Sequence, residues 1–288
     1  MTRRDMGKTQ FADLKDSSGR IQIYVQKNAV GDDTFDTFKN LLDLGDLVGI
    51  KGTLFVTKTG EPTVKVSQLT VLSKALLPLP EKWHGLADTE IRHRQRCLDL
   101  IVNDHVRHLF QTRSRIISET RRFFEDRGFM EVETPMMQPI AGGAAAKPFI
   151  THHNTLGIDL FLRIAPELYL KRLLVGGFEK IFELNRNFRN EGISRRHNPE
   201  FTMIEVYEAY SDFEQMAVLL EEYICHLARK IGGGLLLEFK DEHGQVSKKL
   251  DLTPPWPRIR YRDAICKVAG PDWFELPVAQ KRRKCAEW

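Results

Sequence analysis

Apolar and polar residues alternate along much of the first 75 residues, with the period of a half-buried β-strand. One pair of alternating runs flanks the Ser18-Gly19 turn, and a second pair occupies residues 47–56 and 63–72. Between these pairs, residues 35–44 have the spacing of a helix. Strands, one helix and further strands in so short a segment predict a Greek-key β-barrel of the OB type.

Helical spacing dominates after the barrel. A proline-punctuated stretch at 76–83 and a polar helical segment that reaches residue 104 form a connection. We therefore divide the chain into a barrel (1–75), a linker segment (76–104) and a second domain (105–288). The elements predicted in the second domain are a helix at 106–124, a strand ending at Thr134, a helix at 166–175 and a hairpin at 235–239 and 246–252 that turns at His243-Gly244. Helices and antiparallel strands together make an α+β fold.

A further long helix is predicted between Ser211 and Gly232. The segment Ser211-Asp-Phe-Glu214 has the form of a capping box, in which Ser211 caps the helix and Glu214 reaches back to it. Gly232 follows the last apolar position at helical spacing and ends the helix.

A second hairpin, at 187–207, carries the candidate chemistry. Alternation places Asn187, Arg189 and Glu191 on one face of the outgoing strand. On the returning strand it places these residues on one face: Phe201, Met203, Glu205 and Tyr207. A fixed cation, an aromatic ring and carboxylates on one surface suit a nucleotide and a small cationic substrate. A salt-bridged surface hairpin would explain an isolated Arg-x-Glu pair.

Composition narrows the class of protein. The net charge of +4 is only mildly basic, so any surface that binds nucleic acid must be local. The four cysteines form no Cys-x-x-Cys pair and are expected to be reduced thiols. No apolar run approaches the roughly 20 residues of a membrane span, and the basic N-terminus lacks the apolar core of a signal peptide. We expect a cytoplasmic protein without a membrane partner.

The string FRNEGISRRHNPEFT at 188–202 resembles motif 2 of class II aminoacyl-tRNA synthetases, in the form of the lysyl enzymes. Residues 128–137 resemble motif 1, which forms a homodimer interface in that class, although an internal helix–strand unit would explain them equally well. Residues 142–153 and 162–171 are also similar to lysyl enzymes, and 11–72 resemble their anticodon-binding barrel. The resemblance implies an OB-type barrel, its first strand incomplete at the start of the chain, followed by a class II antiparallel-sheet catalytic domain.

The implied activity is that of a lysine–tRNA ligase. Such an enzyme uses ATP to convert L-lysine to lysyl-adenylate and transfers the lysyl group to tRNA(Lys). Arg189 matches the catalytic arginine that bridges the α-phosphate and the lysine carboxylate, a role that suits the planar, permanently charged guanidinium. The other residues that match ATP-binding positions are Glu191 at the adenine amino group, Phe201 stacked on the adenine, and Arg196, His197 and Asn198 near the phosphates.

Lysine selection requires carboxylates, because a desolvated ammonium needs an anion. Glu205 and Tyr207 match the pair that receives the ε-ammonium. Glu167 and the carbonyl of Gly143 match the positions that bind the α-amino group, and Arg189 binds the carboxylate. Relatives that take aspartate need a cation at the side-chain end, so Glu205 argues against them.

The barrel is expected to read the anticodon. Phe11 and Gln22 match residues that stack on the central anticodon base and bond its edge, and Arg4 and Glu61 match flanking contacts. A core phenylalanine would explain Phe11 alone.

The resemblance thins beyond residue 264. Nothing in 273–288 resembles motif 3, the ligands of Mg²⁺ or a further lysine-binding glutamate, so the resemblance implies that these lie beyond Trp288 and that no metal ligand lies within the chain. We therefore expect the 288-residue chain alone to have little or no adenylation activity. The alternative is a non-catalytic RNA-binding or regulatory paralogue. A relative that modifies proteins is disfavoured, because such relatives lack the barrel.

Overall fold

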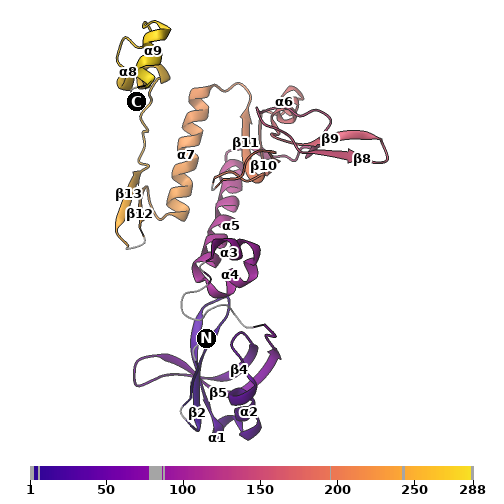
Figure 1. Cartoon of the computed structure of the whole chain (residues 1–288), viewed down its shortest axis with the longest axis vertical. Coiled ribbons are helices and arrows are strands. Elements are labelled where there is room, and N and C mark those ends of the chain that lie inside the picture. The colour runs from indigo at the N-terminus through magenta and orange to yellow at the C-terminus, as the bar shows by residue number, and fades with distance from the viewer. Residues whose placement is uncertain are drawn as a thin grey trace. The chain divides into compact units, whose positions relative to one another are not determined.

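The computed structural model describes residues 3–5, 7–77, 86, 88–194, 196–241 and 244–286, with only the backbone of 3–5. The chain forms two compact units, Met1–Phe110 and Gln111–Trp288 (Figure 1). The division at residue 110 falls inside one long helix, α5 (Asp104–Glu125). Part of the predicted linker segment, residues 78–85 and 87, lies outside the described residues.

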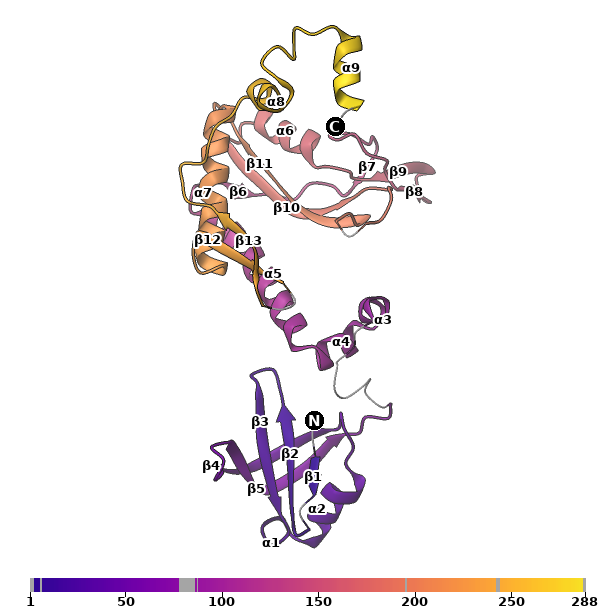
Figure 2. The same ribbon diagram turned by 60° about the vertical axis from the view of Figure 1, so that its left-hand side comes forward.

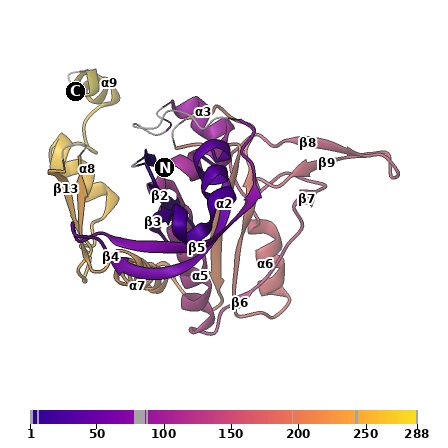
Figure 3. The same ribbon diagram turned by 90° about the horizontal axis from the view of Figure 1, so that it is seen from below.

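The first unit contains a five-stranded sheet with the order β1-β2-β3-β5-β4. Its strands are β1 (Arg3–Asp5), β2 (Thr9–Lys15), β3 (Arg20–Gln26), β4 (Leu47–Val56) and β5 (Pro62–Ser73). All pairs are antiparallel except β3–β5, and β4 and β5 run side by side over most of their length (Figure 3). The strands predicted from alternation are therefore confirmed.

The helical stretch between β3 and β4 differs from the prediction. It begins earlier, with α1 (Lys27–Val30) and α2 (Asp32–Asp36), and ends at Leu41 in a π-helical turn, η1 (Thr37–Leu41). The π-turn is closed by a hydrogen bond from Leu42 N to Thr37 O at 3.2 Å. Phe35 of α2 and Phe38 of η1 both lie in the barrel core, which also contains Ala12, Ile23, Val25 and Val66.

Two short helices fill the described part of the predicted linker segment. They are α3 (Thr89–Arg94) and α4 (Arg96–Val102). The fully buried Asp99 holds them together, because it accepts hydrogen bonds from Arg92, Arg96 and Asn103. Such a paired carboxylate can be buried, whereas an isolated one could not.

The second unit is built on the hairpin of β10 (Lys180–Phe188) and β11 (Glu200–Glu208). A short parallel strand, β6 (Met130–Glu131), extends the sheet to the order β11-β10-β6. One face of the sheet packs against α5 and α7 (Phe213–Ile231) through an aromatic cluster of Phe123, Phe124, Phe129 and Phe182, joined by Tyr223. Figure 2 shows α6 (Glu167–Val175) alongside β10 and β11.

The predicted capping box of α7 is wrong by one position. Asp212, not Ser211, is the N-cap residue, and its carboxylate accepts a hydrogen bond from Gln215 N at 2.9 Å. Ser211 instead donates from its hydroxyl to the Gln215 side chain at 3.0 Å. A carboxylate opposes the positive end of the helix dipole better than a hydroxyl.

The remaining elements complete the second unit. A three-stranded sheet is made of β7 (Met137–Gln138), β9 (Ile158–Leu162) and β8 (Ile150–His153). The predicted hairpin is present as β12 (Leu236–Lys240) and β13 (Val246–Asp251), although His243 in its turn lies outside the described residues. Two helices follow, α8 (Tyr261–Ala269) and α9 (Val278–Ala286).

Candidate active site

The β10–β11 hairpin has a polar face opposite the aromatic cluster. Its register pairs Ile181 with Tyr207, Glu183 with Glu205, Asn185 with Met203 and Asn187 with Phe201. Since directly paired residues point to the same side of a sheet, these eight side chains share one face, here called the polar face. The predicted common face of Phe201, Met203, Glu205 and Tyr207 is therefore confirmed by the register.

The predicted alternation is wrong beyond Phe188. Strand β10 ends there, so Glu191 is an exposed loop residue rather than a member of the polar face. The backbone explains the change, because Asn190 N donates to Lys147 O at 2.8 Å and Glu191 N donates to Arg189 O at 3.0 Å. These donors are turned away from the strand partner. Arg189, by contrast, stays bonded to the returning chain, through its N–H to Pro199 O at 2.8 Å.

Arg189 and Phe201 lie together at the open end of the hairpin. The guanidinium carbon of Arg189 is 5.3 Å from the centroid of the Phe201 ring, within the range of a cation–π contact. The Nε atom of Arg189 is buried and has no hydrogen-bond partner among the described residues. Buried donors are rarely left without a partner in a working protein, so this end of the hairpin is suited to an anion.

The loop between the strands carries the three candidate phosphate contacts. Ser194 and His197 close it, with a hydroxyl–imidazole hydrogen bond of 2.8 Å between Ser194 Oγ and His197 Nδ1. Arg196 N also donates to Ser194 Oγ at 3.2 Å. The side chains of Arg196, His197 and Asn198 are all exposed, so the structure brings them near the hairpin end without burying them.

A cluster of carboxylates lies farther along the polar face. Tyr207 Oη donates to Glu205 Oε2 at 3.0 Å, and both residues are half-buried. Glu167, the first residue of α6, contributes electrostatically to both of them and pairs with Lys171 at 2.6 Å. Burial raises the pKa of Glu205, and the charges of Glu167 and Glu183 raise it further against the opposing hydrogen bond from Tyr207. The cluster is short of positive charge.

Gly143 lies directly against Glu167. A Cβ atom at residue 143 would be 3.0 Å from Glu167 Cβ and 3.3 Å from Ala165 Cβ. The backbone φ of +86° is also one that side-chain-bearing residues rarely adopt. The four residues predicted to bind lysine besides Arg189 are thus brought together by α6, β11 and the loop before β8.

One buried ion pair of this site was not predicted from the sequence. Arg163 Nη1 lies 2.5 Å from Glu183 Oε1, and both side chains are fully buried. Strand alternation, which placed Glu205 on the polar face, would also have placed Glu183 there, because Glu183 lies two positions before Asn185 on the partner strand. Arg163 gave no such signal, because it follows β9 and reaches β10 only through the tertiary fold.

On the barrel, three of the predicted anticodon-binding residues line one hollow of about 220 Å³. They are Phe11, Gln22 and Glu61, and Arg20 and Thr59 share the lining. The Phe11 ring lies 4.9 Å from that of Tyr24, and Gln22 Oε1 accepts a hydrogen bond from Thr63 at 2.9 Å. The backbone of Arg4 pairs with Phe11, but the Arg4 side chain lies outside the described residues.

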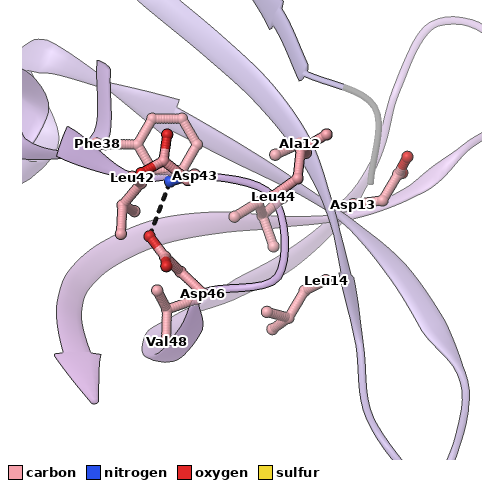
Figure 4. Close-up of a pocket in the computed structure, with 10 residues that line it drawn as sticks. Ala12, Asp13, Leu14, Phe38, Leu42, Asp43, Leu44, Asp46 and Val48 are labelled. Atoms are coloured by element: carbon pink, nitrogen blue, oxygen red, sulfur yellow. Dashed lines mark hydrogen bonds between the residues drawn. The ribbon is translucent and has the colours of Figure 1, made fainter. Parts of the chain in front are cut away.

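A second hollow of the barrel is apolar and of similar volume, about 220 Å³ (Figure 4). Asp46 is one of its lining residues and accepts hydrogen bonds from Asp43 N and Ala75 N, both at 2.7 Å, and from Lys74. Burial alone would raise the pKa of Asp46, but these donors outweigh it and lower the pKa to about 2. Asp46 therefore fastens the chain on either side of β4 and β5.

The described residues contain no group of three or more His, Cys, Asp or Glu side chains arranged to hold a metal ion. No helix among them is long and apolar enough to cross a membrane.

Comparisons with known proteins cover both units. Residues 88–285 match the family model of tRNA synthetases class II (D, K and N), and residues 1–72 match that of the OB-fold nucleic acid binding domain. The lysine–tRNA ligase of Moorella thermoacetica is 55% identical over 98% of this chain and 56% of its own length. The lysine–tRNA ligase of Coxiella burnetii (strain Dugway 5J108-111) is 59% identical over 92% of this chain and 52% of its own length. That of Syntrophomonas wolfei is 55% identical over 100% of this chain and 57% of its own length. The chain spans about half the length of these curated relatives.

Proposed function

The chain belongs to the class II tRNA synthetases of the aspartate, lysine and asparagine group, and from this membership we propose that it acts in the ATP-dependent ligation of L-lysine to tRNA(Lys). The match to the class II family and to the OB-fold domain confirms the resemblance and the barrel type predicted from the sequence. The chemistry of the site is the basis for choosing among aspartate, lysine and asparagine as the substrate.

The observation that most strongly supports lysine as the substrate is the half-buried Glu205 with its hydrogen-bond partner Tyr207. A carboxylate in this position stabilises a primary ammonium, whereas it would repel the carboxylate of aspartate and leave the amide of asparagine with a charged partner. Glu167 adds a second negative charge from α6, close to Gly143. We assign Glu205 and Tyr207 to the ε-ammonium, and Glu167 and the Gly143 carbonyl to the α-ammonium.

Arg189 supports the activation step. One oxygen of the lysine carboxylate attacks the α-phosphorus of ATP, and the bond from that phosphorus to the bridging oxygen breaks. Pyrophosphate leaves with the electron pair, giving lysyl-adenylate. A guanidinium at Arg189, with its Nε free among the described residues, fits the negative charge that builds up on the α-phosphate. Phe201 would carry the adenine ring, and Glu191 its amino group.

The flexible phosphates of ATP extend past the hairpin end. We assign Arg196, His197 and Asn198 to them, since exposed loop side chains can close on a bound polyphosphate. Mg²⁺ would neutralise phosphate charge when it accompanies ATP.

The second half-reaction joins the lysyl group to tRNA. A hydroxyl of the terminal ribose attacks the adenylate carbonyl, and AMP leaves. The barrel contributes selection of the tRNA through Phe11, Gln22, Glu61 and Arg4, because an aromatic ring beside hydrogen-bonding side chains is a usual site for an unpaired base. We also propose a homodimer through α5 and residues 128–137, since α5 exposes the apolar side chains of Leu109, Phe110 and Ile116. We further propose that the protein works in the cytoplasm.

The test uses stable sulfamoyl analogues of lysyl-, aspartyl- and asparaginyl-adenylate, titrated into the 288-residue chain by calorimetry. We expect the lysyl analogue to bind at least about 100-fold more tightly than the other two, since loss of one buried charge partner costs several kcal/mol. Equal or tighter binding of the aspartyl or asparaginyl analogue would overturn the proposal. Binding of tRNA(Lys) without binding of any analogue would instead favour a non-catalytic RNA-binding paralogue.

A further inference from the structure

Two carboxylates of the polar face lie directly opposite one another. Glu183 of β10 is the cross-strand partner of Glu205 of β11, and their side chains point to the same side of the sheet. Like charges in such a pair are destabilising, and the effect grows when water is excluded. Without compensation, one of the two would take up a proton.

Arg163 supplies that compensation from beneath the face. It lies at hydrogen-bond distance from Glu183 at 2.5 Å, and its orientation is fixed by Nε donating to Arg186 O at 2.9 Å and Nη1 donating to Thr134 O at 3.2 Å. Thr134 adds two further donors to Glu183, its backbone N–H and its hydroxyl, at 3.2 and 2.7 Å. Donors on both oxygens are the environment of an ionised carboxylate.

We propose, on the basis of the lysine–tRNA ligase function, that Arg163 is a positioning residue for lysine selection: by neutralising Glu183, it leaves Glu205 ionised for the ε-ammonium of lysine. Arg163 itself is fully buried and is not assigned a contact with the substrate. It acts through Glu183 on the charge of the residue opposite.

The charged and titratable groups that face Glu205 come from four segments. They are Tyr207 on β11, Glu183 on β10, Glu167 on α6 and Arg163 after β9. Lys171 reaches Glu167 but does not approach Glu205 as a partner. Arg163 is thus the one positive charge among the groups that influence Glu205 in the described part of the chain. Its removal leaves Glu183 and Glu205 without a positive partner among these groups, whereas Glu167 keeps Lys171.

The arrangement also explains why a buried ion pair is present here at all. A buried pair seldom stabilises a fold more than apolar residues of the same volume would. Arg163 Nη2 even lacks a partner among the described residues, which adds a cost. A role in setting the charge of the pocket accounts for a pair that packing alone does not favour.

The experiment measures the dissociation constants of lysyl- and norleucyl-sulfamoyl adenylate between pH 5.5 and 9. Norleucine lacks only the ε-ammonium, so the ratio of the two constants cancels titration of the α-amino group. For Arg163→Met we expect the preference for the lysyl analogue to fall at pH 7, because Glu205 then holds its proton to a higher pH, and to recover as the pH is raised. The double variant Arg163→Met/Glu183→Gln should restore the preference at pH 7.

A second variant covers the case in which Arg163→Met does not fold. Glu183→Gln keeps Arg163 and removes the opposing carboxylate, so the lysyl preference should persist to lower pH than in the unaltered chain. The matched control deletes the Lys180–Glu208 pair of the same two strands, 2.7 Å apart, by Lys180→Met/Glu208→Gln. That variant should leave the pH profile of the preference unchanged.

The outcomes separate this inference from the proposed function. If the unaltered chain shows no preference for the lysyl analogue, the proposed function fails. If it shows the preference, but neither Arg163→Met nor Glu183→Gln moves its pH dependence, Arg163 is structural only and the inference is overturned.

Discussion

One residue of the polar face, Glu205, is expected to lower the stability of the fold while it serves the proposed function. Glu205 is half-buried beside Glu167 and Glu183, and burial together with these charges raises its pKa. The folded protein therefore prefers the protonated form of this carboxyl more than the unfolded chain does. As pH rises from the usual value of 4.5 through the raised pKa, the folded state loses stability. The carboxylate to which we assign lysine selection therefore lowers the stability of the empty site at neutral pH.

Replacing Glu205 by Gln should consequently stabilise the empty protein. The melting temperature of Glu205→Gln is expected to exceed that of the unaltered chain at pH 7, and the difference should vanish near pH 4, where both side chains are neutral. Thermal unfolding at a series of pH values measures it. Glu200→Gln, an exposed position on the same strand, serves as the control and should change stability by no more than about 0.5 kcal/mol. A lower melting temperature for Glu205→Gln at pH 7 would contradict the electrostatic account.

Gly143 is expected to be intolerant of a methyl group. Gly143→Ala combines a strained φ with contacts of 3.0 and 3.3 Å to the Cβ atoms of Glu167 and Ala165. We expect it to weaken lysyl-adenylate analogue binding by about tenfold or more, since displacement of Glu167 by a fraction of an ångström is enough to lose a charged contact. Gly157→Ala has a similarly positive φ of +62° but no neighbour within 4 Å. Equal effects of the two substitutions on binding would show that strain alone is responsible.

Strand alternation predicted much of the residue-scale site. It placed Phe201, Glu205 and Tyr207 on one face because the hairpin register carries the period of two through β11. It placed Glu191 wrongly, because β10 ends at Phe188 and the next backbone donors turn to other partners. It could not find Arg163, whose partner Glu183 is joined to it by tertiary packing rather than by spacing.

At the scale of elements, the strands of the barrel could be predicted from the sequence more closely than the ends of its helices. The strands of the barrel were predictable, since their alternation reflects one buried and one exposed face. The π-turn η1 was not, because it depends on how Phe35 and Phe38 enter the core. The N-cap of α7 was misplaced by one residue, because Ser211 and Asp212 are both good capping residues and only the backbone distinguishes them.

Asp46 provides a test at this scale. Asp46→Asn should weaken the barrel by about 1–3 kcal/mol at pH 7, since at least one buried donor loses its acceptor. Because the folded pKa of Asp46 is about 2 and its usual value is 3.8, the stabilisation is fully present above pH 3.8 and is lost as pH falls through 2. Hydrogen exchange of the β2–β5 amides measures the difference in stability between Asp46→Asn and the unaltered chain. This difference should become smaller as the pH falls from 4 to 2.

The control for this substitution is Asp43→Asn, whose exposed carboxylate pairs with Lys74 at 2.9 Å. It should cost less than about 1 kcal/mol, as exposed ion pairs do. A constant difference between Asp46→Asn and the unaltered chain across this pH range would contradict the role given to the ionised carboxylate.

At the scale of the whole molecule, each compact unit carries one part of the proposed function. The barrel presents a hollow with an aromatic ring and hydrogen-bonding side chains, and the second unit presents the polar face. Both unit types were predictable from sequence, because alternation and resemblance point to the same folds. The division inside α5 was not, since a continuous helical pattern carries no mark of which unit each turn belongs to.

The barrel is expected to read RNA independently of the polar face. Phe11→Ala should weaken binding of a tRNA(Lys) anticodon stem-loop by about 5- to 150-fold, the loss of one stacked base. It should also reduce discrimination against a stem-loop with an altered central base. Phe239→Ala, an exposed aromatic on β12, is the control and should leave RNA affinity unchanged. Fluorescence anisotropy with labelled stem-loops measures both, and equal affinities for Phe11→Ala and the unaltered chain would contradict the assignment.

The central claim is that the carboxylate of Glu205 chooses lysine by its charge. Its most direct test is the ratio of the dissociation constants of norleucyl- and lysyl-sulfamoyl adenylate at pH 7.5, measured by calorimetry for the unaltered chain and for Glu205→Gln. The account predicts a ratio of at least about 30 for the unaltered chain, from the cost of breaking a half-buried charge pair, and a ratio near one for Glu205→Gln. A ratio that Glu205→Gln leaves unchanged would contradict it.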